Sequence, residues 1–145
     1  MKYDISALGN ALVDTQYKVD QSFLSEIGLE ADSMTLSSAD EQAPIINKLI
    51  KMGSESMSDC GGSATNSLVA AANYGSKCHH VCRVADDEDG RKYLDSLRSA
   101  GVEHIGISSK NADMPTGKCL ILVTPDAKRT MSSMLGVSAF LGASD

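Results

Sequence analysis

A pair of glycines followed by small polar residues is the segment whose residue types are best suited to binding a ligand. The segment Cys60-Gly61-Gly62-Ser63-Ala64-Thr65-Asn66 precedes a run with helical spacing up to Tyr74. Glycine has no Cβ, so backbone N–H groups at the mouth of a helix can approach a polar ligand closely. Asn66 would stand one turn into the helix, where its amide both donates and accepts hydrogen bonds. This arrangement suits a ligand with many hydroxyl groups, such as a sugar, although a glycine pair before a helix can also be only a turn and a cap.

Two further polar residues follow the first predicted strand, which covers residues 2–8. Asn10 comes directly after that strand, and Asp14 lies a few positions further on. Open parallel sheets bind ligands beyond the carboxyl ends of their strands, so Asn10, Asp14 and Asn66 could converge there. The Asp14 carboxylate could then accept two hydroxyl protons of a polyol. Alternatively, Asp14 is a solvated residue of an edge strand, because residues 11–20 alternate between two faces of mixed polarity.

The cysteines raise the question of a metal site. The chain has four, Cys60, Cys78, Cys82 and Cys119, and none of them form a Cys-x-x-Cys pair. Residues 78–82 alternate like a strand, which places Cys78, His80 and Cys82 on one face. The second pair of ligands that zinc spacings require is missing, so we predict buried free thiols and no metal site.

Composition excludes several classes of protein. The chain has 145 residues, enough for one domain, and a net charge of −6, which argues against non-specific binding to nucleic acid. Reduced thiols and the lack of a signal peptide predict a cytoplasmic protein. The longest strongly apolar run, residues 119–123, is too short to span a membrane. Walker A, G-x-G-x-x-G, G-x-S-x-G and H-E-x-x-H patterns are absent.

Strands and helices alternate along most of the chain, which predicts an α/β fold with a parallel sheet. The last third differs, because two strand-like runs flank Pro125-Asp126-Ala127-Lys128 and predict an antiparallel hairpin. The predicted strands are residues 2–8, 11–20, 33–37, 56–59, 77–84, 102–107, 118–124 and 129–135. The predicted helices are residues 22–27, a helix from the Ser38 capping box to Gly53, residues 63–74 and residues 87–100.

Taken in order, these segments resemble the N-terminal half of PfkB-type carbohydrate kinases, the family that includes ribokinase and adenosine kinase. The matching segments are Gly9-Asn10-Ala11-Leu12-Val13-Asp14, Gly61-Gly62-Ser63-Ala64-Thr65-Asn66-Ser67 with Gly75, Arg83-Val84-Ala85-Asp86-Asp87-Glu88-Asp89-Gly90, Pro115-Thr116-Gly117 and Asp126-Ala127-Lys128-Arg129-Thr130. Two positions depart from the family pattern. Ala85 stands where glycine is usual, and Leu68 where a small residue is common.

The resemblance implies ATP-dependent phosphorylation of a sugar or nucleoside hydroxyl, with ATP and Mg²⁺ as cofactors. It implies a ribokinase-like parallel sheet flanked by helices, with a small antiparallel lid sheet near residues 11–20, 33–37 and 118–135. Residues 1–145 would be the acceptor-binding part of one such domain. The acceptor-binding residues it implies are Asn10, Asp14, Gly61, Gly62, Ser63 and Asn66. Arg129 would be a lid residue that approaches the phosphates, or else a surface charge beside a turn.

Two segments that contain acidic residues could be mistaken for parts of the phosphoryl-transfer site. Residues 86–89 complement a helix dipole more readily than they form a magnesium site. The family's catalytic base lies in a Gly-Ala-Gly-Asp motif, and Gly142-Ala143-Ser144-Asp145 is only superficially similar, because it follows the hairpin directly. We therefore expect the chain to stop before the ATP-binding half and to contain no catalytic residue, and so to be inactive alone.

The sequence leaves two alternatives for the acceptor, a sugar or a nucleoside, and two for the function. Ser63 after the glycine pair and Leu12 before Asp14 favour the adenosine kinase branch, although sugar-specific relatives can share them. The alternative function is a non-catalytic dimerising module or truncated pseudo-kinase. In that case a homodimer would form through the lid sheet, because an uncovered sheet edge invites pairing.

Overall fold

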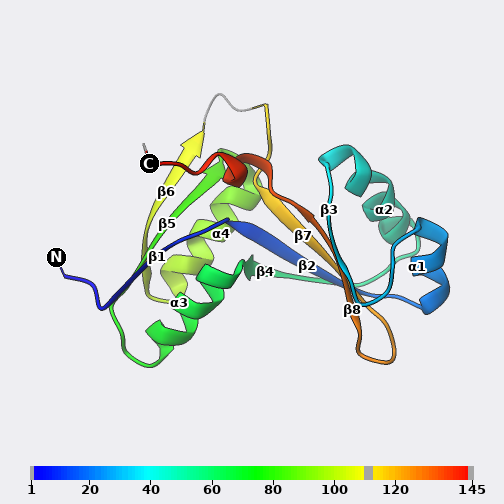
Figure 1. Ribbon diagram of the computed structural model, residues 1–145, viewed down its shortest axis with the longest axis horizontal. Helices are drawn as coiled ribbons and strands as arrows, with labels where there is room; N and C mark the ends of the chain where they lie inside the picture. The colour runs from blue at the N-terminus through cyan, green and yellow to red at the C-terminus, as the bar shows by residue number, and fades with distance from the viewer. Residues whose placement is uncertain (1, 110–112, 144–145) are drawn as a thin grey trace. The chain divides into compact units, whose positions relative to one another are not determined.

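The computed structural model describes residues 2–109 and 113–143, in which strands and helices alternate (Figure 1). The strands are β1 (Ile5–Leu8), β2 (Leu12–Lys18), β3 (Met34–Leu36), β4 (Ser56–Gly61), β5 (Cys78–Ala85), β6 (Val102–Ser109), β7 (Gly117–Val123) and β8 (Arg129–Met134). The helices are α1 (Gln21–Ile27), α2 (Ala39–Lys51), α3 (Ser63–Asn73), α4 (Glu88–Ser99) and the short 3₁₀ helix η1 (Gly136–Phe140). The predicted α/β class and the order of its elements are confirmed.

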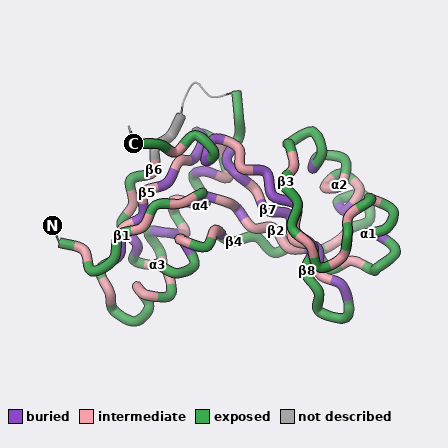
Figure 2. Tube along the Cα trace, viewed as in Figure 1, coloured by how far each residue is buried: buried purple, intermediate pink, exposed green. Residues whose placement is uncertain are grey.

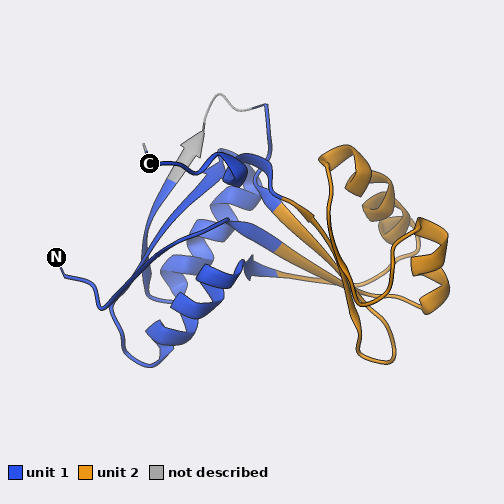
Figure 3. Ribbon diagram, in the orientation of Figure 1, with its two compact units in different colours: residues 1–13, 59–117, 135–145 blue, residues 14–58, 118–134 orange. Residues whose placement is uncertain are grey.

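The chain forms two compact units (Figure 3). Unit 1 comprises residues 1–13, 59–117 and 135–145, and unit 2 comprises residues 14–58 and 118–134. Each unit has its own apolar core, with buried residues concentrated along strands such as β5 and β7 (Figure 2).

Unit 1 contains a three-stranded sheet of order β1-β5-β6, in which both pairs are parallel. Helices α3 and α4 pack on this sheet. The alternation predicted for β5 is confirmed, because Cys78, His80 and Cys82 are all at most 1% exposed. The buried core of this unit consists of Ala11, Val13, Leu68, Cys78, Cys82, Val84, Tyr93, Leu97 and Val102.

The second sheet has five strands in the order β3-β8-β7-β2-β4. The predicted hairpin is confirmed, because β7 pairs with β8 in antiparallel fashion. The sheet is mixed rather than antiparallel throughout, because β3 pairs with β8 in parallel. The possibility that residues 11–20 form an edge strand is wrong, because β2 lies between β7 and β4. Its mixed pattern reflects a strand that buries one set of alternate residues, including Val13 and Tyr17, while the other set is less buried.

Helix α2 begins at the predicted capping box. Ser38 Oγ accepts a hydrogen bond from Glu41 N at 3.2 Å, and Glu41 Oε2 accepts one from Ser38 N at 2.7 Å. The helix continues through Pro44, which removes one backbone donor but lies on an exposed face. On the opposite face Gln42, which is 2% exposed, donates from Nε2 to Ser132 O of β8 at 2.7 Å.

Several predicted boundaries shift by a few residues. Strand β1 begins at Ile5 rather than at residue 2, and β4 continues to Gly61 instead of ending at residue 59. The last two residues of the tail that we excluded as a catalytic motif, Ser144 and Asp145, lie outside the described residues. None of the described helices is long and apolar enough to cross a membrane.

Candidate acceptor-binding site

The predicted glycine pair forms a tight turn between β4 and α3. Gly62 has φ of 100° and ψ of 138°, a conformation that residues with a side chain rarely adopt. A Cβ at Gly62 would come 2.6 Å from the carbonyl oxygen of Asn10. Glycine is therefore required here both by the backbone angle and by the close approach of another backbone segment.

The end of β1 lies against the same turn. A Cβ at Gly9 would come 2.8 Å from the Cβ of Ala64, in the first turn of α3. Gly9 N also donates to Val81 O of β5 at 3.3 Å, which extends the parallel pairing beyond β1. The structure thus brings together the Asn10 segment and the glycine pair, although β1 belongs to the three-stranded parallel sheet and β4 to the five-stranded sheet.

The beginning of α3 is polar and accessible. The N-cap residue Gly62 has no side chain that could cap the helix, and the side chains of Asn10, Ser63 and Asn66 are exposed. Asn66 N donates to Gly62 O at 2.9 Å, so the helical hydrogen bonding starts at the glycine pair. Uncapped N–H groups beside side-chain amides can donate to and accept from hydroxyl groups.

The other two predicted site residues belong to unit 2. Asp14 is half-buried on β2, and its charge is one of the influences on Cys119, whose pKa is raised mainly by burial. Arg129 is exposed at the start of β8, opposite Val123 of β7. Substrate contact by Asp14 and phosphate contact by Arg129 stay predictions.

Sequence reasoning missed a buried cluster of three polar side chains behind the glycine pair. Thr65, His80 and Tyr93 are 0%, 0% and 1% exposed and come from α3, β5 and α4. Thr65 Oγ1 lies 2.5 Å from Tyr93 Oη and 3.1 Å from His80 Nε2. Tyr93 Oη also donates to Gly61 O at 3.5 Å, so the cluster reaches the turn itself. The available signal was His80, a histidine among the apolar alternate residues of β5.

The structure also connects two segments that resembled the family separately. The Asp87 carboxylate caps α4 by accepting from Gly90 N at 2.7 Å. It accepts as well from Thr116 N at 2.9 Å and from Thr116 Oγ1 at 2.7 Å. Thr116 Oγ1 in turn accepts from Ala85 N at 3.0 Å. The acidic run therefore begins a helix, as predicted, and one of its carboxylates fixes the segment that leads into β7.

The candidate metal segment on β5 has other bonding partners. His80 Nδ1 is hydrogen-bonded to Ala7 O at 3.3 Å, and His80 Nε2 is hydrogen-bonded to Thr65 Oγ1 at 3.1 Å. Burial raises the pKa of the Cys82 thiol to about 12, so this sulfur keeps its proton. Among the residues that the structure describes, no group of three or more His, Cys, Asp or Glu side chains could hold a metal ion.

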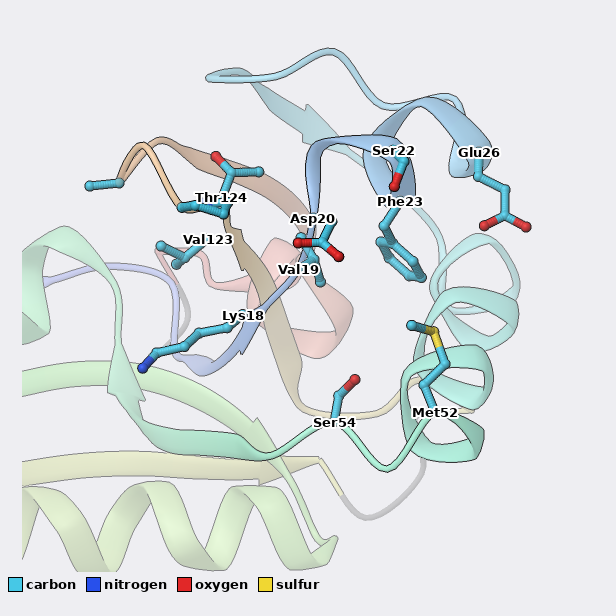
Figure 4. Close-up of a pocket in the computed structure, with 12 residues that line it drawn as sticks. Lys18, Val19, Asp20, Ser22, Phe23, Glu26, Met52, Ser54, Val123 and Thr124 are labelled. Atoms are coloured by element: carbon cyan, nitrogen blue, oxygen red, sulfur yellow. The ribbon is translucent and has the colours of Figure 1, made fainter.

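A separate cavity of about 610 Å³ lies within unit 2 (Figure 4). Its wall combines apolar groups such as Phe23 and Met52 with polar groups such as Lys18, Asp20 and Ser54. None of the predicted site residues lines it. Its volume falls in the range of small-molecule sites, which makes it the alternative location against which the glycine turn must be tested.

The parallel sheet, the mixed sheet and the glycine turn together define part of a ribokinase-like α/β fold. The family model described as pfkB family carbohydrate kinase matches residues 33–144. The chain therefore belongs to the pfkB family of carbohydrate kinases.

Individual relatives include both sugar and nucleoside kinases. Ribokinase from Mus musculus is 30% identical over 87 residues, which are 59% of this chain and 26% of the mouse protein. The structure of a probable sugar kinase from Rhizobium etli CFN 42 matches with a TM-score of 0.89 and 28% identity, over 99% of this chain and 42% of that one. Adenosine kinase from Sinorhizobium meliloti matches with a TM-score of 0.81 and 31% identity, over 100% of this chain and 43% of that one. The chain thus spans less than half the length of these relatives.

Replacing Gly62 by alanine tests the turn. We expect Gly62→Ala to lower the free energy of unfolding by at least about 1 kcal/mol more than Gly75→Ala does, because it adds a steric overlap to the backbone strain. Gly75 is the matched control, since its φ of 91° is also positive but its Cβ would meet nothing within 4 Å. Chemical denaturation measures both variants, and equal losses would contradict the described close approach.

Proposed function

We propose that this chain is the acceptor-binding part of a kinase that transfers a phosphoryl group from ATP to a hydroxyl of a sugar or nucleoside. The observation that carries the proposal is the turn at Gly62, which abuts Asn10 at the uncapped start of α3. Membership of the pfkB family supports the reaction class. Both acceptor classes stay in the proposal, because the relatives include ribokinase and adenosine kinase.

Each residue that we predicted to bind the acceptor has a role in this proposal. The N–H groups at the start of α3, with Gly61, Gly62 and Ser63, approach the acceptor hydroxyls, and the amides of Asn10 and Asn66 donate to and accept from them. Asp14 accepts two hydroxyl protons in charge-assisted hydrogen bonds, which orients the acceptor. The strands that we predicted as a lid, near residues 11–20, 33–37 and 118–135, are proposed to limit the access of water to a bound acceptor.

The cofactors are proposed to bind elsewhere in the kinase. Phosphoryl transfer depends on positioning the nucleotide and on stabilising charge with groups such as Mg²⁺. The described residues provide no acidic cluster that fits a metal ion. We therefore assign ATP and Mg²⁺ to the part of the relatives that this chain does not match.

Removing the charge of Asp14 tests the acceptor role. In a full-length kinase that contains this chain, Asp14→Asn should weaken acceptor binding at least tenfold, because hydrogen bonds to a charged group contribute about 1.5–3 kcal/mol each. The affinity for ATP should change little. Steady-state kinetics and calorimetry with ribose and adenosine measure both quantities.

Asp20→Asn is the matched control for this substitution. Asp20 is an exposed aspartate shortly after β2, and its side chain makes no capping hydrogen bond to α1. The control should leave acceptor affinity unchanged if the acceptor binds at the glycine turn, and should lower it if the acceptor binds in the cavity of unit 2, which Asp20 lines. An acceptor KM that is the same in Asp14→Asn and in the unmodified kinase would show that Asp14 is only a polar strand residue.

The isolated chain should not turn over ATP. Phosphoryl transfer requires that one site hold both the nucleotide and the attacking hydroxyl in reactive geometry, and we expect the isolated chain to hold only the acceptor. Acceptor-dependent ADP release should therefore be no faster than in buffer without the chain. A coupled assay with a panel of sugars and nucleosides measures this rate. Turnover by the purified 145-residue chain would place the catalytic residues within it, contrary to the proposal.

A second candidate function, a non-catalytic dimerising module, is favoured by the edge strand β3. Met34 and Leu36 on this strand are 58% and 62% exposed, and β3 ends the order of the five-stranded sheet. Exposed apolar edge strands pair readily with other chains. This candidate also covers a truncated pseudo-kinase that keeps the fold and has lost the reaction.

Sedimentation of the isolated chain distinguishes this candidate. If β3 mediates a homodimer, Leu36→Lys should weaken association at least tenfold, because a charge then faces the paired edge. Ile50→Lys is the matched control, since Ile50 on α2 is also 62% exposed. A monomer at every concentration would exclude the dimerising module.

A further inference from the structure

The cavity of about 610 Å³ in unit 2 is bounded by three segments of that unit. The first runs from the end of β2 into α1, the second follows α2, and the third is the turn between β7 and β8. The ring of Phe23, the thioether of Met52 and the hydroxyl of Ser54 point towards one another, and the Asp20 carboxylate lies beside them (Figure 4). A small molecule in this cavity would therefore meet apolar and polar groups together.

Two of the polar groups at this cavity already have partners. Glu26 is ion-paired with Lys48, whose ammonium also lies 5.6 Å from the centroid of the Phe23 ring. Thr124 is 3% exposed, and its hydroxyl donates to Asp126 Oδ1 at 2.5 Å. Both groups are therefore satisfied before any ligand binds.

The charged groups of Lys18 and Asp20 lack such partners. In the part of the chain that the structure describes, neither side chain makes a hydrogen bond or an ion pair, and both are exposed. The two residues lie in an extended segment, because Lys18 ends β2 and Asp20 has φ of −82° and ψ of 158°. Between them, Val19 N donates to Val123 O at 3.0 Å, so the strand pairing continues past β2. The wall of the cavity thus carries an unpaired positive and an unpaired negative charge.

We propose that this cavity binds a zwitterionic small molecule with an apolar body, of the chemical class of the α-amino acids with apolar side chains. The ligand's carboxylate accepts a hydrogen bond from the Lys18 ammonium. Its ammonium group donates to the Asp20 carboxylate and to the hydroxyl oxygen of Ser54. Its side chain packs against Phe23 and Met52, since a flexible thioether beside an aromatic ring adapts to apolar groups of varied shape.

Spacing and charge together select this class of ligand. Residues two positions apart in an extended chain are separated by roughly 6–7 Å, and the flexible lysine stem adjusts this separation to the two charged groups on one α-carbon. A ligand with a single charge gains one attraction and meets one repulsion, whereas a zwitterion pairs with both groups. A neutral sugar or nucleoside offers no charge to either residue. The site therefore differs from the proposed acceptor site and does not depend on it.

Chemical-shift mapping with L-phenylalanine tests the proposal on the isotope-labelled 145-residue chain. We expect saturable changes at the amides of Asp20, Phe23 and Ser54, with a Kd of about 1 mM for a ligand of this small size. The amides of Gly61 and Gly62 should stay in place. Phenethylamine lacks the carboxylate and 3-phenylpropionate lacks the amine. Each should bind at least about threefold more weakly, because each loses one exposed ion pair.

Two variants each remove one of the charges. Asp20→Asn and Lys18→Gln should each weaken the binding of L-phenylalanine at least about threefold, and both residues are exposed, so the fold should be retained. Asp20→Asn should not weaken the binding of 3-phenylpropionate, because that compound has no ammonium group to pair with Asp20. Glu55→Gln and Lys51→Gln are the matched controls, since both residues are exposed and neither lines the cavity.

Three results would overturn the proposal. The first is the absence of a saturable change with L-phenylalanine up to about 20 mM, far above the expected Kd. The second is equal binding of the three compounds, which would mean that only the apolar wall acts. The third is a loss of binding in the two controls as large as in the two variants. None of these results bears on the acceptor site, because no sugar or nucleoside is present, and failure of the acceptor site would leave this one unaffected.

Discussion

The backbone at Gly62 approaches the carbonyl of Asn10 so closely that no side chain fits between them. A similar close approach occurs at Gly9, the residue before Asn10, where a Cβ would overlap with the side chain of Ala64. These two approaches determine where the end of β1 lies relative to the start of α3, and through the pairing with β5 they fix the neighbouring strand ends as well. The polar surface around the turn is a consequence, since glycine leaves backbone groups accessible where other residues would cover them.

Burial of polar groups behind the turn adds a second requirement. The helix-facing side of β5 is apolar except for His80, and an unsatisfied polar group there would cost about 1–3 kcal/mol. Thr65 and Tyr93 provide the partners, so α3, β5 and α4 can pack only in an arrangement that brings their three side chains together. In the same way, the Asp87 carboxylate is the hydrogen-bond partner of Thr116, the residue directly before β7. Apolar burial favours packing in many orientations, whereas these hydrogen bonds select one.

Local signals were sufficient to predict most elements and the glycine turn of the candidate site. The Ser38 capping box and the Pro125 turn specify α2 and the β7–β8 hairpin from a few adjacent residues. The glycine pair was recognisable because its requirement is local, namely a backbone conformation that only glycine adopts readily. The link between this pair and Asn10 came from the rule that parallel sheets bind ligands beyond the carboxyl ends of their strands, and then from the resemblance to the family.

Features that depend on residues far apart in sequence were not predictable in this way. The parallel pairing of β3 with β8 joins residues about a hundred positions apart, and the interior place of β2 depends on two partners from different parts of the chain. Thr65 and Tyr93 looked like ordinary helix residues, since their hydrogen bond exists only after α3 and α4 have packed on the sheet. A buried polar residue in an apolar pattern indicates such a cluster but does not name its partners.

The central claim is that the turn at Gly62, and not the cavity of unit 2, is where this chain meets an acceptor. Mapping chemical-shift changes on the labelled chain during titration with high concentrations of ribose and adenosine tests it most directly. The account predicts saturable changes centred on Gly61, Gly62 and Asn66 for at least one of the two compounds. Changes centred on Phe23 and Met52 in the cavity of unit 2, or no saturable change with either compound, would contradict it.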